Sequence, residues 1–174
     1  HLIRSQLDRC RKIIDRMQTH AGQSIGESIQ ATSVKDISQI MLDGLIEHDR
    51  DRVKLSLPEG ASLAILAVPR DALSQAMRAL VQNAIDADPT GKSIQINVSH
   101  HKGMWQWSIV DQGSGMSNDQ LKRVSEPFYT TKPPGKGMGL GVFLAKNVVG
   151  RLGGSIEFET RPNRGTTVLV SLPS

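Results

Sequence analysis

The chain has 174 residues, of which 38% are hydrophobic and 22% are charged, and this balance argues against a disordered protein. The length fits one domain with a short extension, and no apolar run is long enough to span a bilayer. The formal net charge of +4 comes from scattered basic residues, and aromatic residues make up only 3% of the chain, so we expect no nucleic acid partner of the base-stacking kind.

The first predicted element is a helix over residues 2–18. Its apolar residues recur at a 4-3-4-3 spacing, at Ile3, Leu7, Cys10, Ile14 and Met17. This spacing is typical of the apolar seam of a coiled coil or helical bundle. A single helix of this length is marginal alone, so we expect it to pack on a partner helix or on a second copy of itself. Residues 19–33 are polar and rich in Gly and Ser, and we interpret them as a linker with room for one short strand.

Helix and strand patterns follow in the next part of the chain. Ser33 suits the N-cap position of an amphipathic helix over residues 34–48. Two strand-like runs, 52–57 and 63–68, are joined by the turn PEGA, and a second strong amphipathic helix covers residues 70–88.

The remaining patterns predict two hairpins and two helices. One hairpin spans residues 93–111 around the turn HKG, and the other spans 155–173 around NRG. A short helix over 117–125, with Ser117 as its N-cap, and a longer helix over 139–152 lie between the hairpins. This order of elements predicts a two-layer α/β sandwich with a mixed sheet.

Two glycine clusters interrupt these elements, DQGSGM at 111–116 and GKGMGLG at 135–141. Fixing glycine costs conformational entropy, so such density indicates turns or a backbone that comes close to a ligand, most often a phosphate. The second cluster formally resembles a dinucleotide fingerprint, but residues 126–134 contain three prolines and no strand pattern. No GKS or GKT occurs, so the cluster is not a P-loop either.

Four short sequence segments in a fixed order are together far more specific for one protein family than either glycine cluster alone. They are Asn83 within ALVQNAIDA, Asp111 in DQGSGM, the segment EPFYTTK, and GKGMGLGV opening a helix, followed by GTT at 165–167. Their order and spacing, over roughly residues 32–174, resemble the ATP-binding domain of sensor histidine kinases and their relatives in gyrase, Hsp90 and MutL. The resemblance implies a Bergerat-type fold for a catalytic domain over 34–174, preceded by one helix of a dimerisation bundle.

The resemblance implies a role for each piece in binding ATP and Mg²⁺. Asp111 would accept a hydrogen bond from the adenine amine, with Thr166 nearby and with Gly113 and Gly115 bending the chain around the base. Asn83 would coordinate Mg²⁺ through its amide oxygen, a hard ligand of the kind Mg²⁺ prefers.

The second cluster would be a hinge for a lid and a cradle for phosphates. The helix after it would direct its positive end toward the triphosphate, and Lys132 and Lys136 would add positive charge. Phe128 would pack the lid against the body of the domain. The residues expected to bind the nucleotide here are Lys132, Gly137, Gly139, Leu140 and Gly141.

The resemblance also implies an activity and its partners. A histidine kinase transfers the γ-phosphoryl group of ATP to a histidine on the dimerisation bundle, for onward transfer to a response regulator. None of the five histidines has an acceptor context, so we expect the acceptor upstream of His1 and no autophosphorylation by this chain alone. The resemblance further implies a homodimer through the bundle helix, a cytoplasmic location, and room for an upstream membrane sensor region.

Three positions depart from the family pattern. Ala79 stands where hydrolytic relatives have a general-base glutamate, so we expect weak ATP hydrolysis, and this argues against a hydrolytic ATPase. Asp86 replaces a common basic residue; the two interpretations are a place near the metal and a place facing solvent, of which we favour solvent. Gly141 replaces a common serine. An ATP-sensing interaction module without kinase activity remains the alternative function.

The stretch around Cys10 carries a weaker resemblance. RSQLDRCRKII is similar to the corresponding helix of redox-responding kinases of the RegB/PrrB type, which carry a cysteine there. In that interpretation Cys10 forms an intersubunit disulfide or a sulfenic acid. The other interpretation is a small apolar residue packed on the bundle seam.

Overall fold

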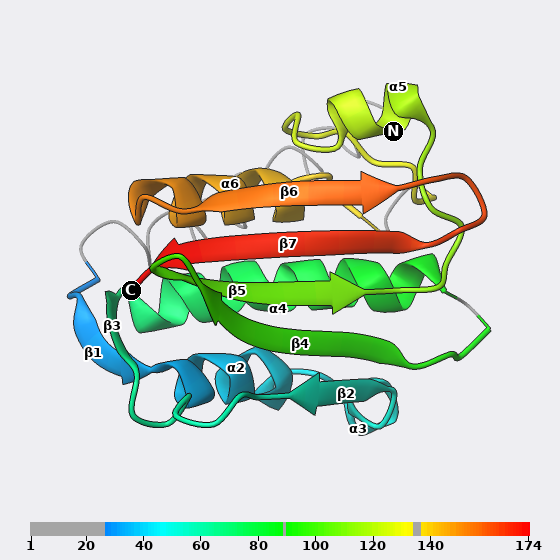
Figure 1. Ribbon diagram of the computed structural model, residues 1–174. Helices are drawn as coiled ribbons and strands as arrows, with labels where there is room; N and C mark the ends of the chain where they lie inside the picture. The colour runs from blue at the N-terminus through cyan, green and yellow to red at the C-terminus, as the bar shows by residue number, and fades with distance from the viewer. Residues whose placement is uncertain (1–26, 89, 134–136) are drawn as a thin grey trace, which may run out of the picture.

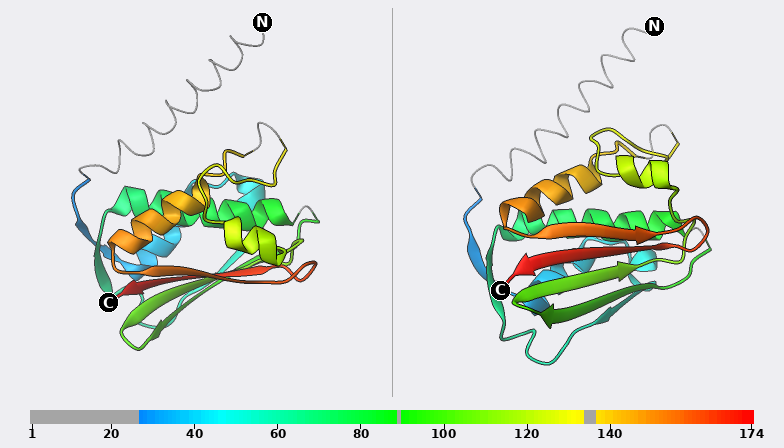
Figure 2. Two further views of the ribbon diagram at one scale, coloured as in Figure 1. Left: turned by 90° about the horizontal axis from the view of Figure 1, so that it is seen from above. Right: turned by 45° about the horizontal axis from the view of Figure 1, so that its top comes forward.

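A mixed five-stranded sheet forms one layer of the computed structural model, and helices form the other (Figures 1 and 2). The structure describes residues 27–88, 90–133 and 137–174. The strand order is β2-β4-β5-β7-β6. The strands are β2 (Val53–Ser56), β4 (Ile94–His101), β5 (Met104–Val110), β6 (Ser155–Thr160) and β7 (Thr166–Pro173). The predicted two-layer α/β sandwich with a mixed sheet is therefore confirmed.

The sheet is mixed because β2 pairs parallel with β4, whereas the other three pairings are antiparallel. Alternate side chains along each strand point toward the helices, as the period of two in the sequence predicts. One cross-strand row contains four buried residues in register: Val98, Trp107, Val170 and Ile156. The two predicted hairpins, β4–β5 and β6–β7, are confirmed.

Three helices cover one face of the sheet (Figure 2): α2 (Val34–Asp43), α4 (Arg70–Ala87) and α6 (Gly141–Arg151). Helix α4 contacts both α2 and α6. Ser33 caps α2 as predicted, because its side chain accepts a hydrogen bond from the Asp36 N–H at 3.0 Å. The buried Trp107 Nε1 donates to Ser38 Oγ at 2.8 Å, and this bond fixes α2 against β5.

The run predicted as a strand over 63–68 joins a different sheet from the run at 52–57. Strand β3 (Ile65–Val68) pairs antiparallel with β1 (Gln30–Ser33). Strand β1 lies within the segment that we interpreted as a linker. The loop between β2 and β3 is tied to the start of α2, since Val34 N donates to Ala64 O at 2.9 Å. The turn PEGA is thus part of a longer loop that carries the chain away from the large sheet.

The helix predicted over 34–48 is divided in two, and the second part extends beyond the predicted end. Helix α2 ends at Asp43, with Gly44 as its C-cap residue, and α3 (Glu47–Arg50) follows as a separate turn of helix. Helix α5 (Asn118–Arg123) begins at the predicted N-cap Ser117, which forms a capping box with Gln120. The predicted helix over 2–18, including Cys10, lies outside the described residues. Within the part that is described, no helix is long and apolar enough to cross a bilayer.

Candidate functional site

Asp111 follows the last residue of β5, and its side chain is fixed by backbone groups. Only 5% of the residue is exposed. Its Oδ1 accepts hydrogen bonds from Gly113 N at 2.8 Å and from Thr166 N at 3.2 Å. Burial raises the pKa of the Asp111 carboxyl, although both of these backbone hydrogen bonds oppose the shift. The structure thus brings together three of the residues that the sequence predicts for the adenine end of the site.

The glycines of the first cluster lie where two backbones approach each other closely. A Cβ on Gly113 would overlap the carbonyl of Ala87, and Ser114 N donates to that carbonyl at 3.3 Å. Gly115 has φ of 62°, and a Cβ there would overlap the carbonyl of Arg161. Because only glycine fits such positions, DQGSGM can turn tightly between the end of α4 and the loop that precedes β7.

Asp88 is a second buried carboxylate near Asp111, and the sequence analysis missed it. Its Oδ1 accepts from Thr90 N at 2.9 Å and from the Thr90 hydroxyl, and its Oδ2 accepts from Lys92 N at 3.1 Å. The side-chain hydrogen bond from Thr90 lowers the pKa of Asp88, with help from both backbone hydrogen bonds and from the Arg52 guanidinium, against the effect of burial. The negative charge of Asp88 also contributes to raising the pKa of Asp111.

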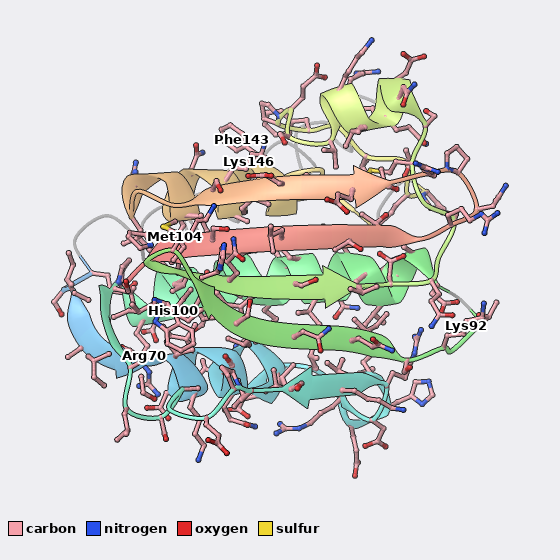
Figure 3. All side chains as sticks on the ribbon, in the orientation of Figure 1. Arg70, Lys92, His100, Met104, Phe143 and Lys146 are labelled. Carbon is pink, nitrogen blue, oxygen red and sulfur yellow. The ribbon has the colours of Figure 1, made fainter. Side chains whose placement is uncertain are left out.

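The end of the sheet that carries these residues is visible in Figure 3. Lys92 lies beyond the tip of β5, whereas His100 and Met104 lie at the opposite end. A signal for Asp88 was present in the sequence. An acidic side chain at the C-terminus of a helix is disfavoured by the helix dipole, so its presence there indicates specific hydrogen bonds.

Asn83 lies on α4, and the segment after α5 reaches back to it. Lys132 Nζ donates to Asn83 Oδ1 at 3.0 Å and pairs with Asp86 Oδ2 at 2.5 Å. Asp86 is exposed, as predicted, but its carboxylate also pairs with a lysine 46 residues away, which the sequence did not indicate. Both the predicted metal ligand and the predicted phosphate-binding lysine are present, but they bind each other.

The second glycine cluster brings the start of α6 against the same part of α4. A Cβ on Gly141 would lie 3.4 Å from the Ala79 Cβ and 3.8 Å from Asn83 Nδ2. Leu140 is the buried N-cap residue of α6 and makes no side-chain cap hydrogen bond. The amide groups of the first turn of a helix have no partner within the helix, and such a helix start favours an anion. Of the second cluster, Gly135 and Lys136 lie outside the described residues.

Two further contacts hold the segment that precedes α6. Phe128 N donates to Gly139 O at 2.9 Å, and a Cβ on Gly137 would meet the side chains of Lys132 and Thr130. Phe128 itself is 54% exposed and has a φ of 66°. Its expected packing against the body of the domain is therefore not observed, because more than half of the residue is exposed although its backbone is fixed.

One helix connects the two halves of the candidate site. Ala87, which contacts Gly113, follows Asn83 by four residues on α4, so the two positions are about 6 Å apart along the helix axis.

A cavity of about 300 Å³ lies at the other end of β7, lined by β3, Leu152 and residues 172–174. That cavity includes none of the candidate residues. Among the described residues, no group of three or more His, Cys, Asp or Glu side chains is placed to hold a metal ion.

The mixed sheet with three helices on one face defines the class of the fold, a two-layer α/β sandwich. The profile of the family described as "Histidine kinase-, DNA gyrase B-, and HSP90-like ATPase" matches residues 68–174, which include Asn83 and Asp111. The chain belongs to this family and carries the ATPase-type domain of sensor histidine kinases.

Two similar proteins come from Bacillus. Sensor protein DegM of Bacillus sp. (strain B21-2) is 30% identical over 178 residues, which cover 99% of this chain and 45% of that protein. Sporulation kinase B of Bacillus subtilis (strain 168) is 30% identical over 179 residues, covering 99% of this chain and 40% of that protein. The chain thus spans less than half the length of these relatives.

Solved structures of histidine kinases share the fold. The nucleotide-free catalytic domain of histidine kinase ThkA gives a TM-score of 0.70 at 22% identity, with 83% of this chain and 95% of that chain covered. Acinetobacter baumannii histidine kinase AdeS gives a TM-score of 0.69 at 16% identity, with 97% of this chain and 80% of that chain covered.

Proposed function

We propose that this chain is the catalytic, ATP-binding part of a two-component sensor histidine kinase. It would transfer the γ-phosphoryl group of Mg-ATP to a histidine on a dimerisation bundle, from which a response regulator would receive it. One observation carries the proposal: a single turn of α4 connects Asn83 to the Asp111 turn, in a domain of the histidine kinase family. ATP would therefore lie along this end of α4.

The adenine end of the proposed site is formed by Asp111 and its neighbours. Both backbone hydrogen bonds fall on Asp111 Oδ1, so Oδ2 is the oxygen to which the adenine amine would donate. Thr166 fixes the carboxylate through its N–H, and Gly113 and Gly115 keep the turn tight. This arrangement would read the exocyclic amine as a donor and would reject guanine, which presents a carbonyl oxygen at that position.

The phosphate end of the proposed site is formed by the start of α6. Gly137 and Gly139 shape the approach of the chain, and the amide groups after Leu140 and Gly141 would donate to phosphate oxygens. Lys132 would add a point charge.

Asn83 would hold Mg²⁺, and its amide oxygen suits this metal by chemistry and by placement. The oxygen is already in contact with a cation, the Lys132 ammonium, at 3.0 Å. Mg²⁺ keeps several waters and is held by one or two protein oxygens plus substrate phosphates. When bound, it would neutralise charge on the transferred phosphoryl group.

The chain's contribution to phosphoryl transfer would be positioning and charge neutralisation, because the attacking imidazole is itself the nucleophile. Ala79 supports this class of reaction over hydrolysis. Its methyl group faces the start of α6, with 3.4 Å between its Cβ and a Cβ built on Gly141, and an alanine cannot take a proton from water. We therefore expect transfer to an acceptor histidine to be much faster than release of free phosphate.

Phosphotransfer to a separately supplied acceptor bundle tests the proposal. The chain is incubated with Mg²⁺ and ATP labelled at the γ-phosphate, and label is followed on the bundle and in free phosphate. Acid-labile label on the bundle is the expected result. Tight ATP binding without any transfer would instead indicate an ATP-sensing module, and steady phosphate release without an acceptor histidine would indicate a hydrolytic ATPase.

We propose a cytoplasmic kinase that dimerises through the bundle helix over 2–18. This proposal is compatible with a membrane sensor region upstream of that helix. Within that helix, Cys10 is proposed as a redox-responding residue of the RegB/PrrB type, on the sequence alone. Substitution of Cys10 by Ser in the full-length kinase tests this role. An unchanged response of kinase activity to oxidant would leave Cys10 a packing residue of the bundle seam.

A further inference from the structure

The Lys132 ammonium lies between two oxygens of α4 that come from different kinds of side chain. Asn83 contributes an amide oxygen at 3.0 Å and Asp86 contributes a carboxylate oxygen at 2.5 Å. The two residues are three positions apart on the helix and therefore share a face. Hard oxygen atoms that converge on one cation are also what a divalent ion requires.

The carboxylate is itself held in place. Gln82 Nε2 donates to Asp86 Oδ1 at 2.9 Å, which leaves Oδ2 for the cation. Lys132 and Asp86 are only partly exposed, with 30% and 35% of their side chains accessible. The ion pair is thus partly shielded from solvent, so its attraction is screened less than that of a fully solvated surface pair.

We propose that Asn83 and Asp86 form a cation-exchange site, which Lys132 fills when nucleotide is absent and Mg²⁺ fills when nucleotide binds. Asp86 is then a second oxygen of the metal site, either bound to the ion or held to it through a water. Lys132, once displaced, is free to meet the phosphates that arrive with the metal. The inference rests on the proposed role of Asn83 as a metal ligand and adds Asp86 and the exchange of cations to it.

The exchange has a consequence that does not depend on ATP or on phosphotransfer. In the free chain the ammonium excludes a divalent ion both sterically and by repulsion between like charges a few ångströms apart. Removing the ammonium while keeping the apolar stem, as in Lys132→Met, should therefore let a divalent ion bind without nucleotide. Mn²⁺ is a suitable probe because it prefers the same oxygen ligands as Mg²⁺.

Mn²⁺ binding to the whole 174-residue chain is measured by electron paramagnetic resonance of the free ion, with no nucleotide present. Lys132→Met should lower the apparent dissociation constant for Mn²⁺ by about tenfold or more relative to wild type. Lys132→Arg keeps the charge and should stay close to wild type. The double variant Asp86→Asn with Lys132→Met should lose the gain.

Lys54→Met is the matched control for a general loss of positive charge. Lys54 is exposed on the edge strand β2, away from α4 and α6, so its substitution should leave Mn²⁺ affinity within about twofold. Circular dichroism establishes that each variant is folded. Equal Mn²⁺ affinity for Lys132→Met and wild type would overturn the exchange, and a gain that survives Asp86→Asn would overturn the role of Asp86. Failed phosphotransfer with a positive Mn²⁺ result would instead count against the proposed kinase function alone.

Discussion

Asp111 and Thr166 lie 55 residues apart and are joined by two hydrogen bonds. Asp111 N donates to Thr166 O at 2.9 Å, and Thr166 N donates to Asp111 Oδ1 at 3.2 Å. The first bond continues the β5–β7 ladder beyond the end of β5, and the second fixes the carboxylate above it. The orientation of this buried carboxylate is therefore set by the sheet and precedes any ligand.

Asp111→Asn should weaken nucleotide binding without lowering the stability of the fold. Burial raises the pKa of Asp111 above the ordinary value of 3.8, so its ionisation lowers the free energy of unfolding as pH rises through the raised pKa. Asparagine keeps an acceptor oxygen for Gly113 and Thr166 without that charge. We expect the variant to be at least as stable as wild type at pH 7, with an advantage that shrinks toward about pH 3. Urea unfolding at several pH values measures this, and an advantage that grows on acidification would contradict it.

Asp88 should show the opposite dependence on pH. Hydrogen bonds from Thr90 and Lys92 lower the pKa of this carboxyl in the folded chain. Its stabilising contribution is therefore present above the ordinary value of 3.8 and is lost as pH falls through the lowered pKa. We expect Asp88→Ala to reduce the free energy of unfolding by about 1–3 kcal/mol at pH 7. The loss should be smaller near about pH 3, and a loss independent of pH would show that the charge has no part in it.

Gly139→Ala and Gly137→Ala form a matched pair within one segment. Gly139 has φ of 67°, and a Cβ there would overlap the backbone of Phe128 and Tyr129. Gly137 is outside the left-handed region, and its nearest neighbours are side-chain atoms of Lys132 and Thr130. We expect Gly139→Ala to cost at least about 1–2 kcal/mol locally and to weaken ATP binding, whereas Gly137→Ala should weaken ATP binding much less. Calorimetric titration with ATP compares the two, and equal affinities would remove the claim that Gly139 positions the start of α6.

Asn83→Ala should remove the dependence of ATP binding on Mg²⁺, because the proposed amide ligand of the ion is lost. Asn97→Ala is the matched control, since Asn97 is an exposed amide on the face of β4 away from the helices. ATP titrations with Mg²⁺ and with a chelator give the dependence for each variant. A full Mg²⁺ effect in Asn83→Ala would exclude Asn83 as the ligand.

Local patterns in the sequence predicted most of the elements of the fold but not how all of them pair. The hairpins β4–β5 and β6–β7 were predictable because alternating strands flank short turns that contain glycine. The separation of β2 from β3 was not, because the bonds from Val34 and Lys35 to the loop at 58–64 depend on the folded position of α2. An alternating pattern in the sequence identifies a strand, but it does not determine which other strand pairs with it.

The candidate site, too, was predictable from the sequence only in part. Asp111, Gly113 and Thr166 were predicted together because the family pattern links them, and in the structure Gly113 and Thr166 both donate to the Asp111 carboxylate. The contact of Asp86 with Lys132 could not be predicted, since it joins α4 to a loop 46 residues later. Pattern and propensity are local, whereas charge pairing across the fold is set by tertiary packing.

Calorimetric titration of the wild-type chain and of Asp111→Asn with ATP and with GTP, in the presence of Mg²⁺, is the decisive test of adenine recognition. We expect the wild-type chain to bind one ATP and to discriminate strongly against GTP, and we expect Asp111→Asn to lose ATP affinity while remaining folded. Undiminished ATP binding by Asp111→Asn, or equal affinities of the wild-type chain for the two nucleotides, would contradict the claim that Asp111 reads the adenine base.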